Sequence, residues 1–354
     1  MVIPITDPFG VARDPEMPNL ALALDPAEAE RQLQHCLPRL AGEHGFVHLR
    51  QIRVTRYKPA QRCLIEYSVE VERPDGPLET VVMIGKVRAQ HRAKVGYRLL
   101  DWLWNAGFAA DSTDGISVPE PIGVVKDFQM WLQRKVPGRV ATELLAGPGG
   151  VMLAQRIAAA AFKLHRAGVR TRRRHTMADE LRILRKRLPT VAQVDSIRPD
   201  RIQRLLDACE KLGAGTPEPI TCGIHRDFYP DQVMVDGGRL CLVDFDLYCE
   251  GDPGLDIGNF VGHITEQSLR TLGDPEVLVD LEKAMEERFV ELSGEATRSA
   301  VRAYATLTLV RHVYLSTLKP EKQPFTRSLL ELCEERLGLR KAGADLRSCA
   351  ASSI

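Results

Sequence analysis

Apolar and polar residues alternate with a period of two in two neighbouring segments of the first third of the chain. The first follows Phe46 and places Ile52 and Val54 among polar neighbours, and the second, 65–72, has an apolar residue at every second position. A period of two indicates half-buried strands, and the short segment between them predicts a hairpin. The stretch 81–87, VVMIGKV, follows a Pro-Asp-Gly turn and is apolar almost throughout. It predicts a third antiparallel strand, more fully buried than the other two.

Helical signals flank these strands. Residues 25–28, DPAE, combine an N-cap Asp, a Pro at the first helical position and an acid at the third, which predicts a helix from there to about 36–40. Residues 1–24 show no period and are expected to be extended. After the third strand, Val95, Leu99, Trp102 and Leu103 recur at near-helical spacing and predict a helix over 89–106 that ends at Gly107.

The rest of the chain is mostly helical in pattern. Apolar runs at 118–122 and 128–136 predict two more strands, and 233–235 and 240–243 flank Asp-Gly-Gly as a further hairpin. Helices are predicted over 154–167, 177–212, 263–297, 304–318 and 325–337. The fold class is therefore α+β, with an antiparallel sheet first and helices after it.

Composition supports a globular chain of two lobes. The 354 residues are 44% hydrophobic and 27% charged, with 48 basic against 47 acidic residues. A net charge of +1 carries no electrostatic signature of nucleic-acid binding. The sequence shows neither a signal-peptide pattern nor an apolar run long enough for a bilayer, so we expect a soluble, cytoplasmic protein without membrane partners. Eight cysteines lack metal-ligand spacing and are expected to be reduced thiols.

One segment carries the chemistry, at 223–260: GIHRDFYPDQVMVDGGRLCLVDFDLYCEGDPGLDIGNF. It resembles the catalytic segment of protein kinases, H-R-D-x-x-x-x-N followed by D-F-G, with Gln232 in place of Asn and Asp-Phe-Asp at 244–246. Residues 251–256, GDPGLD, resemble the G-D-P-x-x-D element of aminoglycoside phosphotransferases and related small-molecule kinases. The chain is identified as a member of that family over about 46–335.

The resemblance implies a two-lobed protein-kinase-like fold. Its expected parts are an N-terminal extension with a helix (1–45), an N-lobe (46–136), a mainly helical C-lobe (137–340) and a flexible tail (341–354). It also implies transfer of the γ-phosphoryl group of ATP, with Mg²⁺, to a hydroxyl of a small molecule. The implied residues are Asp227 as the catalytic base; Gln232, Asp244 and Asp246 for Mg²⁺; Lys86, Lys58 and Arg62 for the phosphates; and the backbone of Gln133 to Val136 for adenine.

Three features of the sequence depart from the family or leave it open. Lys86 in a buried strand requires an anionic partner, yet Asp101 is the sole acid between it and Gly107. This and Gln232 keep a pseudokinase, acting as a nucleotide-binding scaffold, as an alternative. His-Arg-Asp favours a protein kinase, whereas the absent glycine-rich loop, the absent A-P-E element and the GDPGLD segment oppose one.

The acceptor stays open, as does the oligomeric state. A basic run at 170–174 favours an anionic acceptor, and an acidic stretch at 263–297 favours a cationic one, so the two indications conflict. Asp252 and Asp256 are expected to accept backbone N–H groups and so to brace the catalytic loop rather than take part in the chemistry.

Overall fold

A computed structural model describes residues 3–340 except 37, 43, 75, 90–92, 195 and 196. The chain forms two compact units, Met1–Gly138 with Met234–Asp246, and Arg139–Val233 with Leu247–Ile354. Residues 234–246, which the sequence analysis assigned to the C-lobe, thus group by contact with the first unit. The predicted tail, 341–354, lies outside the described residues.

The first unit is built on a six-stranded sheet, ordered β1-β2-β3-β4-β7-β6. Its strands are β1 (Ile5–Thr6), β2 (Phe46–Lys58), β3 (Arg62–Glu72), β4 (Glu79–Arg88), β6 (Pro121–Val125) and β7 (Met130–Arg134). The predicted hairpins are confirmed, because β3 pairs antiparallel with both β2 and β4. Every second residue of β3 from Cys63 to Val71 is buried, as the alternation predicted.

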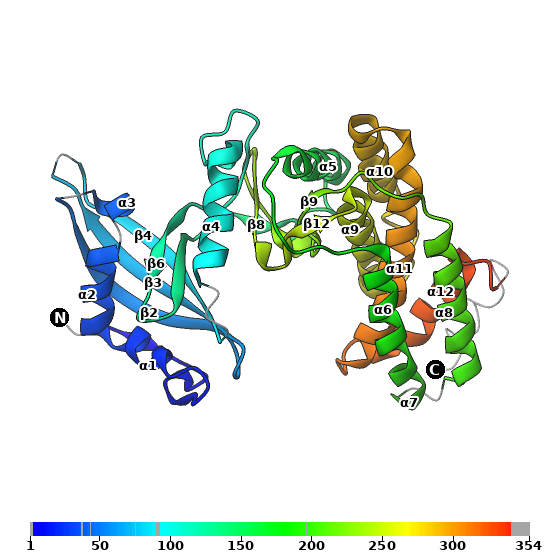
Figure 1. Cartoon of the computed structure of the whole chain (residues 1–354), viewed down its shortest axis with the longest axis horizontal. Helices are drawn as coiled ribbons and strands as arrows, with labels where there is room; N and C mark the ends of the chain where they lie inside the picture. Colours follow the sequence, from blue (N-terminus) through cyan, green and yellow to red (C-terminus); the bar gives the residue numbers. More distant parts are fainter. Residues whose placement is uncertain are drawn as a thin grey trace. The chain divides into compact units, whose positions relative to one another are not determined.

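Helices α1 (Asn19–Leu24), α2 (Pro26–Cys36) and α3 (Pro38–Ala41) belong to the N-terminal segment, and α1 and α2 share one hydrophobic core with the sheet (Figure 1). The predicted N-cap is confirmed by the backbone N–H of Glu28, which donates to Asp25. The predicted extended course was wrong for α1. A six-residue helix between Pro18 and Asp25 is too short to show a period, and burial of Leu20 and Leu24 stabilises it.

Helix α4 (Ala93–Leu103) lies on the opposite face of the sheet, where Gly96 packs against the indole of Trp131. It continues as a π-helical turn, Trp104–Phe108, in which Gly107 has a φ of +92°. The helix was predicted correctly, but only some of the four residues whose spacing predicted it are buried. Val95 and Trp102 are 65% and 52% exposed, whereas Ala93, Leu100 and Leu103 are buried.

A small sheet completes the first unit, with β11 (Arg239–Leu242) between β5 (Ile116–Ser117) and β10 (Val233–Asp236). This confirms the predicted hairpin that leads to Asp244. The β5 strand pairs with β11 in parallel.

The second unit is mainly helical, as predicted. Its helices are α5 (Gly150–Arg166), α6 (Met177–Arg187), α7 (Val191–Val194), α8 (Pro199–Ala214), α9 (Pro253–Gln267), α10 (Val279–Ser293), α11 (Arg298–Thr317) and α12 (Thr326–Arg336). Its short strands are β8 (Arg139–Val140), β9 (Cys222–Ile224) and β12 (Cys249–Gly251), of which the last two pair antiparallel. Helices α9 and α11 pack closely because α9 presents Gly258 and Gly262 to Tyr304 and Thr308.

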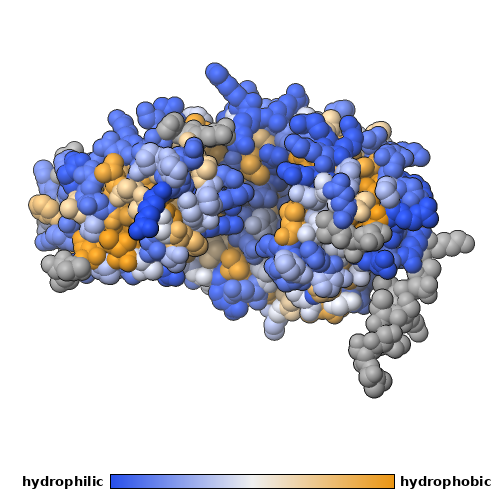
Figure 2. All heavy atoms as spheres, turned by 90° about the horizontal axis from the view of Figure 1, so that it is seen from below, coloured by the Kyte–Doolittle hydropathy of each residue, from blue (hydrophilic) through white to orange (hydrophobic). Residues whose placement is uncertain are grey.

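The surface shows hydrophobic residues as separate patches on a mainly hydrophilic face (Figure 2). Scattered exposed apolar side chains of this kind are ordinary. Over the part of the chain that the structure describes, none of the helices has both the length and the apolar character needed to cross a bilayer.

Candidate active site

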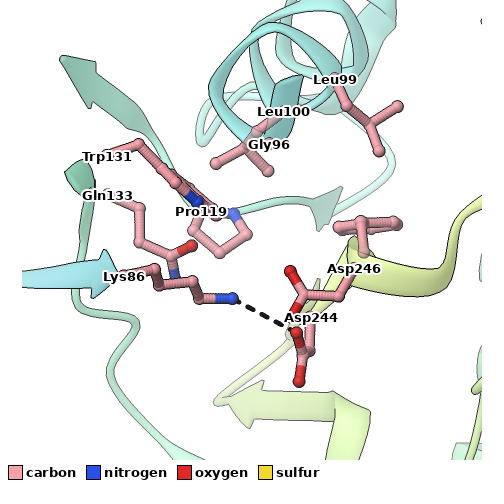
Figure 3. A pocket seen from close by; sticks show the side chains of 10 residues that line it. Lys86, Gly96, Leu99, Leu100, Pro119, Trp131, Gln133, Asp244 and Asp246 are labelled. Atoms are coloured by element: carbon pink, nitrogen blue, oxygen red, sulfur yellow. Dashed lines mark hydrogen bonds and ion pairs between the residues drawn. The ribbon is translucent and has the colours of Figure 1, made fainter. Parts of the chain in front are cut away.

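Lys86 lies near the end of β4 and is only 6% exposed. Its Nζ is 3.4 Å from Oδ1 of Asp244 and 5.0 Å from the centroid of the Trp131 ring (Figure 3). Burial lowers the pKa of Lys86, and the nearby carboxylate of Asp244 opposes this in part. The anionic partner that the sequence required is therefore on the loop after β11 rather than on α4.

Two cations at the end of β4 form ion pairs with Asp244 and Asp246. Because side chains alternate along a strand, Lys86 and Arg88 project from the same face of β4. Lys86 pairs with Asp244, and Arg88 forms an ion pair with Asp246. Asp244 has a φ of +65°, which is uncommon for a residue with a Cβ and often marks a functional position.

Lys86, Asp244 and Asp246 line a cavity of about 20 Å³, with α4 above it in Figure 3. Trp131, Gln133, Leu99 and the 244–246 loop are among its walls. This volume holds little more than one water molecule. Val136, the other residue expected at the adenine edge, instead lines a larger cavity of about 230 Å³ together with Pro119 and Met234.

The β2–β3 turn brings further positive charge close to the end of β4. Arg62, at the start of β3, lies opposite Lys58 of β2 and opposite Arg88 of β4. Positive charge on Arg62 and Arg88 contributes to the lowered pKa of Lys86, after its burial. The Nε of Arg62 is buried and has no hydrogen-bond partner among the described residues.

These residues fit a magnesium nucleotide. Clustered cations and a buried, unpartnered guanidinium N–H suit the oxygen atoms of phosphates, for which Arg and Lys are the usual ligands. Mg²⁺ is commonly held by one or two carboxylates together with substrate phosphates. Within the described ranges no group of three or more His, Cys, Asp or Glu residues could hold a metal. Asp244 and Asp246 supply two carboxylates of this kind.

In the second unit, the loop after β9 carries His225, Arg226 and Asp227. The buried carboxylate of Asp256, on α9, accepts hydrogen bonds from the backbone N–H of His225 (2.8 Å) and of Arg226 (2.7 Å), and it also contacts His165 Nε2 at 2.9 Å. Asp252 accepts from the N–H of Gly254 and caps α9. Both acids are therefore acceptors for backbone groups, as predicted, although only Asp256 holds the loop directly.

Two further loop contacts from α9 were missed by the sequence analysis. Asn259 donates to the carbonyl of Phe228 at 2.8 Å, and the ring of His263 stacks on Tyr229 with centroids 4.6 Å apart. With Asp256 they have the spacing i, i+3 and i+7, which is one face of a helix. The pattern D-x-x-N-x-x-x-H after GDP was the signal that could have identified them.

A buried polar network supports that face from behind. Arg311, on α11, donates to Asn259 and to Glu180, the latter at 3.2 Å. Glu180 in turn lies 2.6 Å from His175 Nε2. Burial acts to raise the pKa of Glu180, but hydrogen bonding from His175 and the charge of Arg311 hold it below its usual value. Glu180 is therefore an anion that links α6 and α11.

The remaining predicted residues also belong to the second unit. Asp227 is partly exposed beside this braced backbone, and Gln232 is buried at the end of a short 3-10 turn, Pro230–Gln232. The backbone N–H of Gln232 donates to the carbonyl of Tyr229 at 2.8 Å.

Comparison with known proteins matches residues 66–302, more than half of the chain, to the model of a phosphotransferase enzyme family. No curated protein matches the sequence. Among solved structures, the chain is similar to a putative aminoglycoside phosphotransferase from Ralstonia eutropha, with a TM-score of 0.58 and 13% identity, covering 88% of this chain and 97% of that one.

The chain is also similar to two kinases that carry other names. A choline/ethanolamine kinase family protein from Mesorhizobium loti gives a TM-score of 0.52 at 15% identity, over 74% of this chain and 88% of that one. A glucosamine kinase, solved with glucosamine, ADP and inorganic phosphate, gives 0.51 at 15% identity, over 79% and 81%. These likenesses confirm the predicted α+β, protein-kinase-like fold.

Proposed function

The chain belongs to the phosphotransferase enzyme family, and from that premise we propose that it transfers the γ-phosphoryl group of ATP, with Mg²⁺, to a hydroxyl group of a small molecule. The observation that carries the proposal is the ion pair between the buried Lys86, at the end of β4, and Asp244. A lysine whose pKa is lowered by burial is stabilised when a further anion arrives, and the phosphates of a nucleotide supply one.

Lys86, Lys58 and Arg62 would bind the phosphates. Arg62 is suited to this role because its buried Nε–H has no partner among the described residues. For adenine we assign the backbone at the end of β7, from Gln133 to Val136. Within it, the N–H groups of Arg134 and Lys135 already donate to the carbonyls of Glu120 and Val82, which favours Val136 as the residue that meets the base.

Asp244, Asp246 and Gln232 would hold Mg²⁺ through oxygen atoms. The bound ion would neutralise charge on the phosphates and hold them in line for transfer. The ion pair with Arg88 holds the carboxylate of Asp246 at the end of β4, where Asp244 also lies. A glutamine amide supplies the same kind of oxygen as asparagine, on a side chain longer by one methylene group.

Asp227 would act on the acceptor. Its carboxylate accepts the proton of the hydroxyl while the hydroxyl oxygen forms a bond to the γ-phosphorus, and the bond from that phosphorus to the bridging oxygen breaks to release ADP. The hydrogen bonds from His225 and Arg226 to Asp256 support this role, since they fix the backbone that precedes Asp227.

The test is nucleotide binding by calorimetry, with and without Mg²⁺, followed by turnover. We expect binding of ATP to require Mg²⁺ and to weaken at least tenfold in Asp244→Ala, while Asp111→Ala, an exposed aspartate, binds like the wild type. Asp227→Ala should lose several decades of turnover and still bind ATP. The acceptor screen begins with glucosamine, choline and ethanolamine, after which two of the similar proteins are named.

Binding that ignores Mg²⁺, or wild-type binding without turnover on any acceptor, would overturn the proposal. Either result would favour the alternative of a nucleotide-binding scaffold, for which the replacement of asparagine by Gln232 is the sequence argument.

A further inference from the structure

The N-terminal segment follows the free edge of the sheet before it enters the core. Strand β1 pairs in parallel with β2, with Ile5 opposite Ile52. Asp7 then accepts hydrogen bonds from the backbone N–H groups of Phe9 and Val11, and Val11 is fully buried. The segment is therefore fixed on the first unit as far as Val11, three residues before Asp14.

Asp14 is 8% exposed, and both oxygens of its carboxylate accept hydrogen bonds. Oδ1 accepts from the backbone N–H of Glu16 at 2.9 Å. Oδ2 accepts from the hydroxyl of Tyr57 at 2.8 Å and from the backbone N–H of Ala60 at 3.1 Å. Two of the three donors thus belong to the β2–β3 hairpin, more than forty residues away in the sequence.

The electrostatics agree with a permanent contact. Burial acts to raise the pKa of Asp14, but the hydrogen bonds from Ala60, Tyr57 and Glu16 outweigh it and hold the pKa below its usual value. The hydrogen bond between Tyr57 and Asp14 also raises the pKa of the Tyr57 hydroxyl to about 12. At neutral pH the carboxylate is charged and the Tyr57 hydroxyl keeps its proton, which are the forms that this contact needs.

The turn that Asp14 holds is unusual. The N–H of Gln61 donates to the carbonyl of Lys58 at 3.1 Å, so Pro59 and Ala60 occupy the two central positions. Ala60 has a φ of +56°. Proline followed by a left-handed residue is the pattern of a type II turn, in which glycine is the usual third residue. This conformation is unfavourable for alanine, and the hydrogen bond from the Ala60 N–H to Asp14 helps to stabilise it.

The same turn carries two of the residues assigned to the phosphates. Lys58 and Arg62 stand at its two ends, opposite each other in the hairpin register. On its other side the turn is tied to the end of β4, because the N–H of Ala89 donates to the carbonyl of Gln61 at 3.1 Å. Contacts from Asp14 and Ala89 therefore fix the turn from both sides.

We propose that Asp14 is a positioning residue for the nucleotide, which holds the β2–β3 turn in one conformation so that Lys58 and Arg62 are preorganised for the phosphates. This inference rests on the proposed function. The segment between β2 and β3 has no glycine, so the turn meets the phosphates through side chains held in place rather than through a flexible backbone. Preorganisation of this kind raises affinity by reducing the entropy lost on binding.

The first measurement uses the protein without nucleotide. Hydrogen exchange of the peptide that covers 58–62 should be about tenfold faster in Asp14→Ala than in the wild type, because the Ala60 N–H loses its acceptor. The matched control is Asp7→Ala, which removes an aspartate from the same segment that contacts Phe9 and Val11 but not the turn. It should leave exchange in 58–62 unchanged.

The second measurement is the affinity for ATP with Mg²⁺ by calorimetry, together with KM for ATP and for the acceptor. Asp14→Ala should weaken ATP binding and raise KM for ATP about tenfold, with KM for the acceptor unchanged. Asp14→Asn retains one acceptor oxygen and should recover part of the loss. Asp7→Ala should bind ATP like the wild type. If Asp14→Ala does not fold, Tyr57→Phe removes a single donor to Asp14, and we expect about a threefold loss.

The outcomes separate this inference from the function it rests on. Wild-type protein that fails to bind ATP with Mg²⁺ overturns both. Wild-type binding with unchanged affinity in Asp14→Ala and in Tyr57→Phe overturns the role of Asp14 alone. Equal losses in Asp14→Ala and Asp7→Ala also overturn it, because they would show a general loosening of the N-terminal segment.

Discussion

The backbone N–H of Arg226 donates a hydrogen bond of 2.7 Å to Oδ1 of Asp256, which lies 30 residues later in the chain. Arg226 has a φ of +69°, so its peptide group is held in a conformation that residues with a Cβ seldom adopt. One carboxylate on α9 thereby fixes the backbone immediately before Asp227.

We first predict that Asp256→Asn destabilises the protein by about 2–4 kcal/mol, because an amide cannot accept from both buried N–H groups and from His165 at once. The free energy of unfolding in urea measures this. Asp111→Asn, at an exposed position, should change it by less than about 0.5 kcal/mol. Equal unfolding midpoints for Asp256→Asn and wild type would contradict the prediction.

Lys86→Met should separate activity from stability. The buried ammonium loses hydration and gains its ion pair with Asp244, whose side chain is 27% exposed and stays in contact with water when the lysine is removed. The substitution should therefore change the free energy of unfolding by no more than about 1 kcal/mol. If Lys86 binds the phosphates as proposed, turnover should fall by about 10²-fold or more, because a positive charge beside them is lost. Lys94→Met, an exposed lysine on α4, is the matched control and should keep full turnover. A large loss of stability in Lys86→Met would mean that the ion pair is mainly structural.

Gly96→Ala should destabilise the protein although alanine is the better helix former. A Cβ at this position would lie 2.8 Å from Nε1 of Trp131, and the indole ring is buried. Overpacking of this kind costs about 1–3 kcal/mol, which exceeds the gain of about 1 kcal/mol in helix propensity. Thermal unfolding provides the measurement, with Val95→Ala on the exposed face of α4 as control. A raised melting temperature for Gly96→Ala would show that α4 can move away from the sheet.

The titration of His312 should reduce the free energy of unfolding as the pH is lowered below about 6.5. Burial lowers the pKa of His312 to about 3, so between pH 3 and 6.5 the unfolded chain binds a proton that the folded protein does not. The loss is about 1.4 kcal/mol for each pH unit. His263, which contacts His312 edge to face, has its pKa lowered in the same direction, again mainly by burial.

The measurement is the difference between wild type and His312→Met in the free energy of unfolding at pH 7.5 and pH 5. The difference is needed because burial raises the pKa of Glu282 to about 7, which gives a slope of opposite sign between pH 4.5 and 7. From pH 7.5 to pH 5 the free energy of unfolding should fall by about 1–2 kcal/mol less in His312→Met than in wild type. Leu309→Ala, a buried apolar position on the same helix, should lower stability at both pH values equally. Parallel profiles for wild type and His312→Met would refute the assignment.

Local signals were enough to predict most elements of the first unit. Strands β2 and β3 follow from alternation, and α2 follows from the cap at Asp25, because each depends on interactions within a few residues. Helix α1 could not be found in this way, since its stability comes from packing against the sheet. The exposed face of α4 was missed for a similar reason. Hydrophobic spacing gave the correct period, but the contact of Gly96 with Trp131 sets which side is buried.

The sequence by itself indicated the phosphotransferase family, because His225 to Asp227 and Asp244 to Asp246 are short segments whose spacing is informative without any fold. The tertiary structure alone decided which groups meet. Asp244 rather than Asp101 pairs with Lys86, the α9 face of Asp256, Asn259 and His263 holds the loop, and Asp14 holds the β2–β3 turn. Each of these contacts joins residues far apart in the chain, and the energy that selects them comes from burial, which no local pattern encodes.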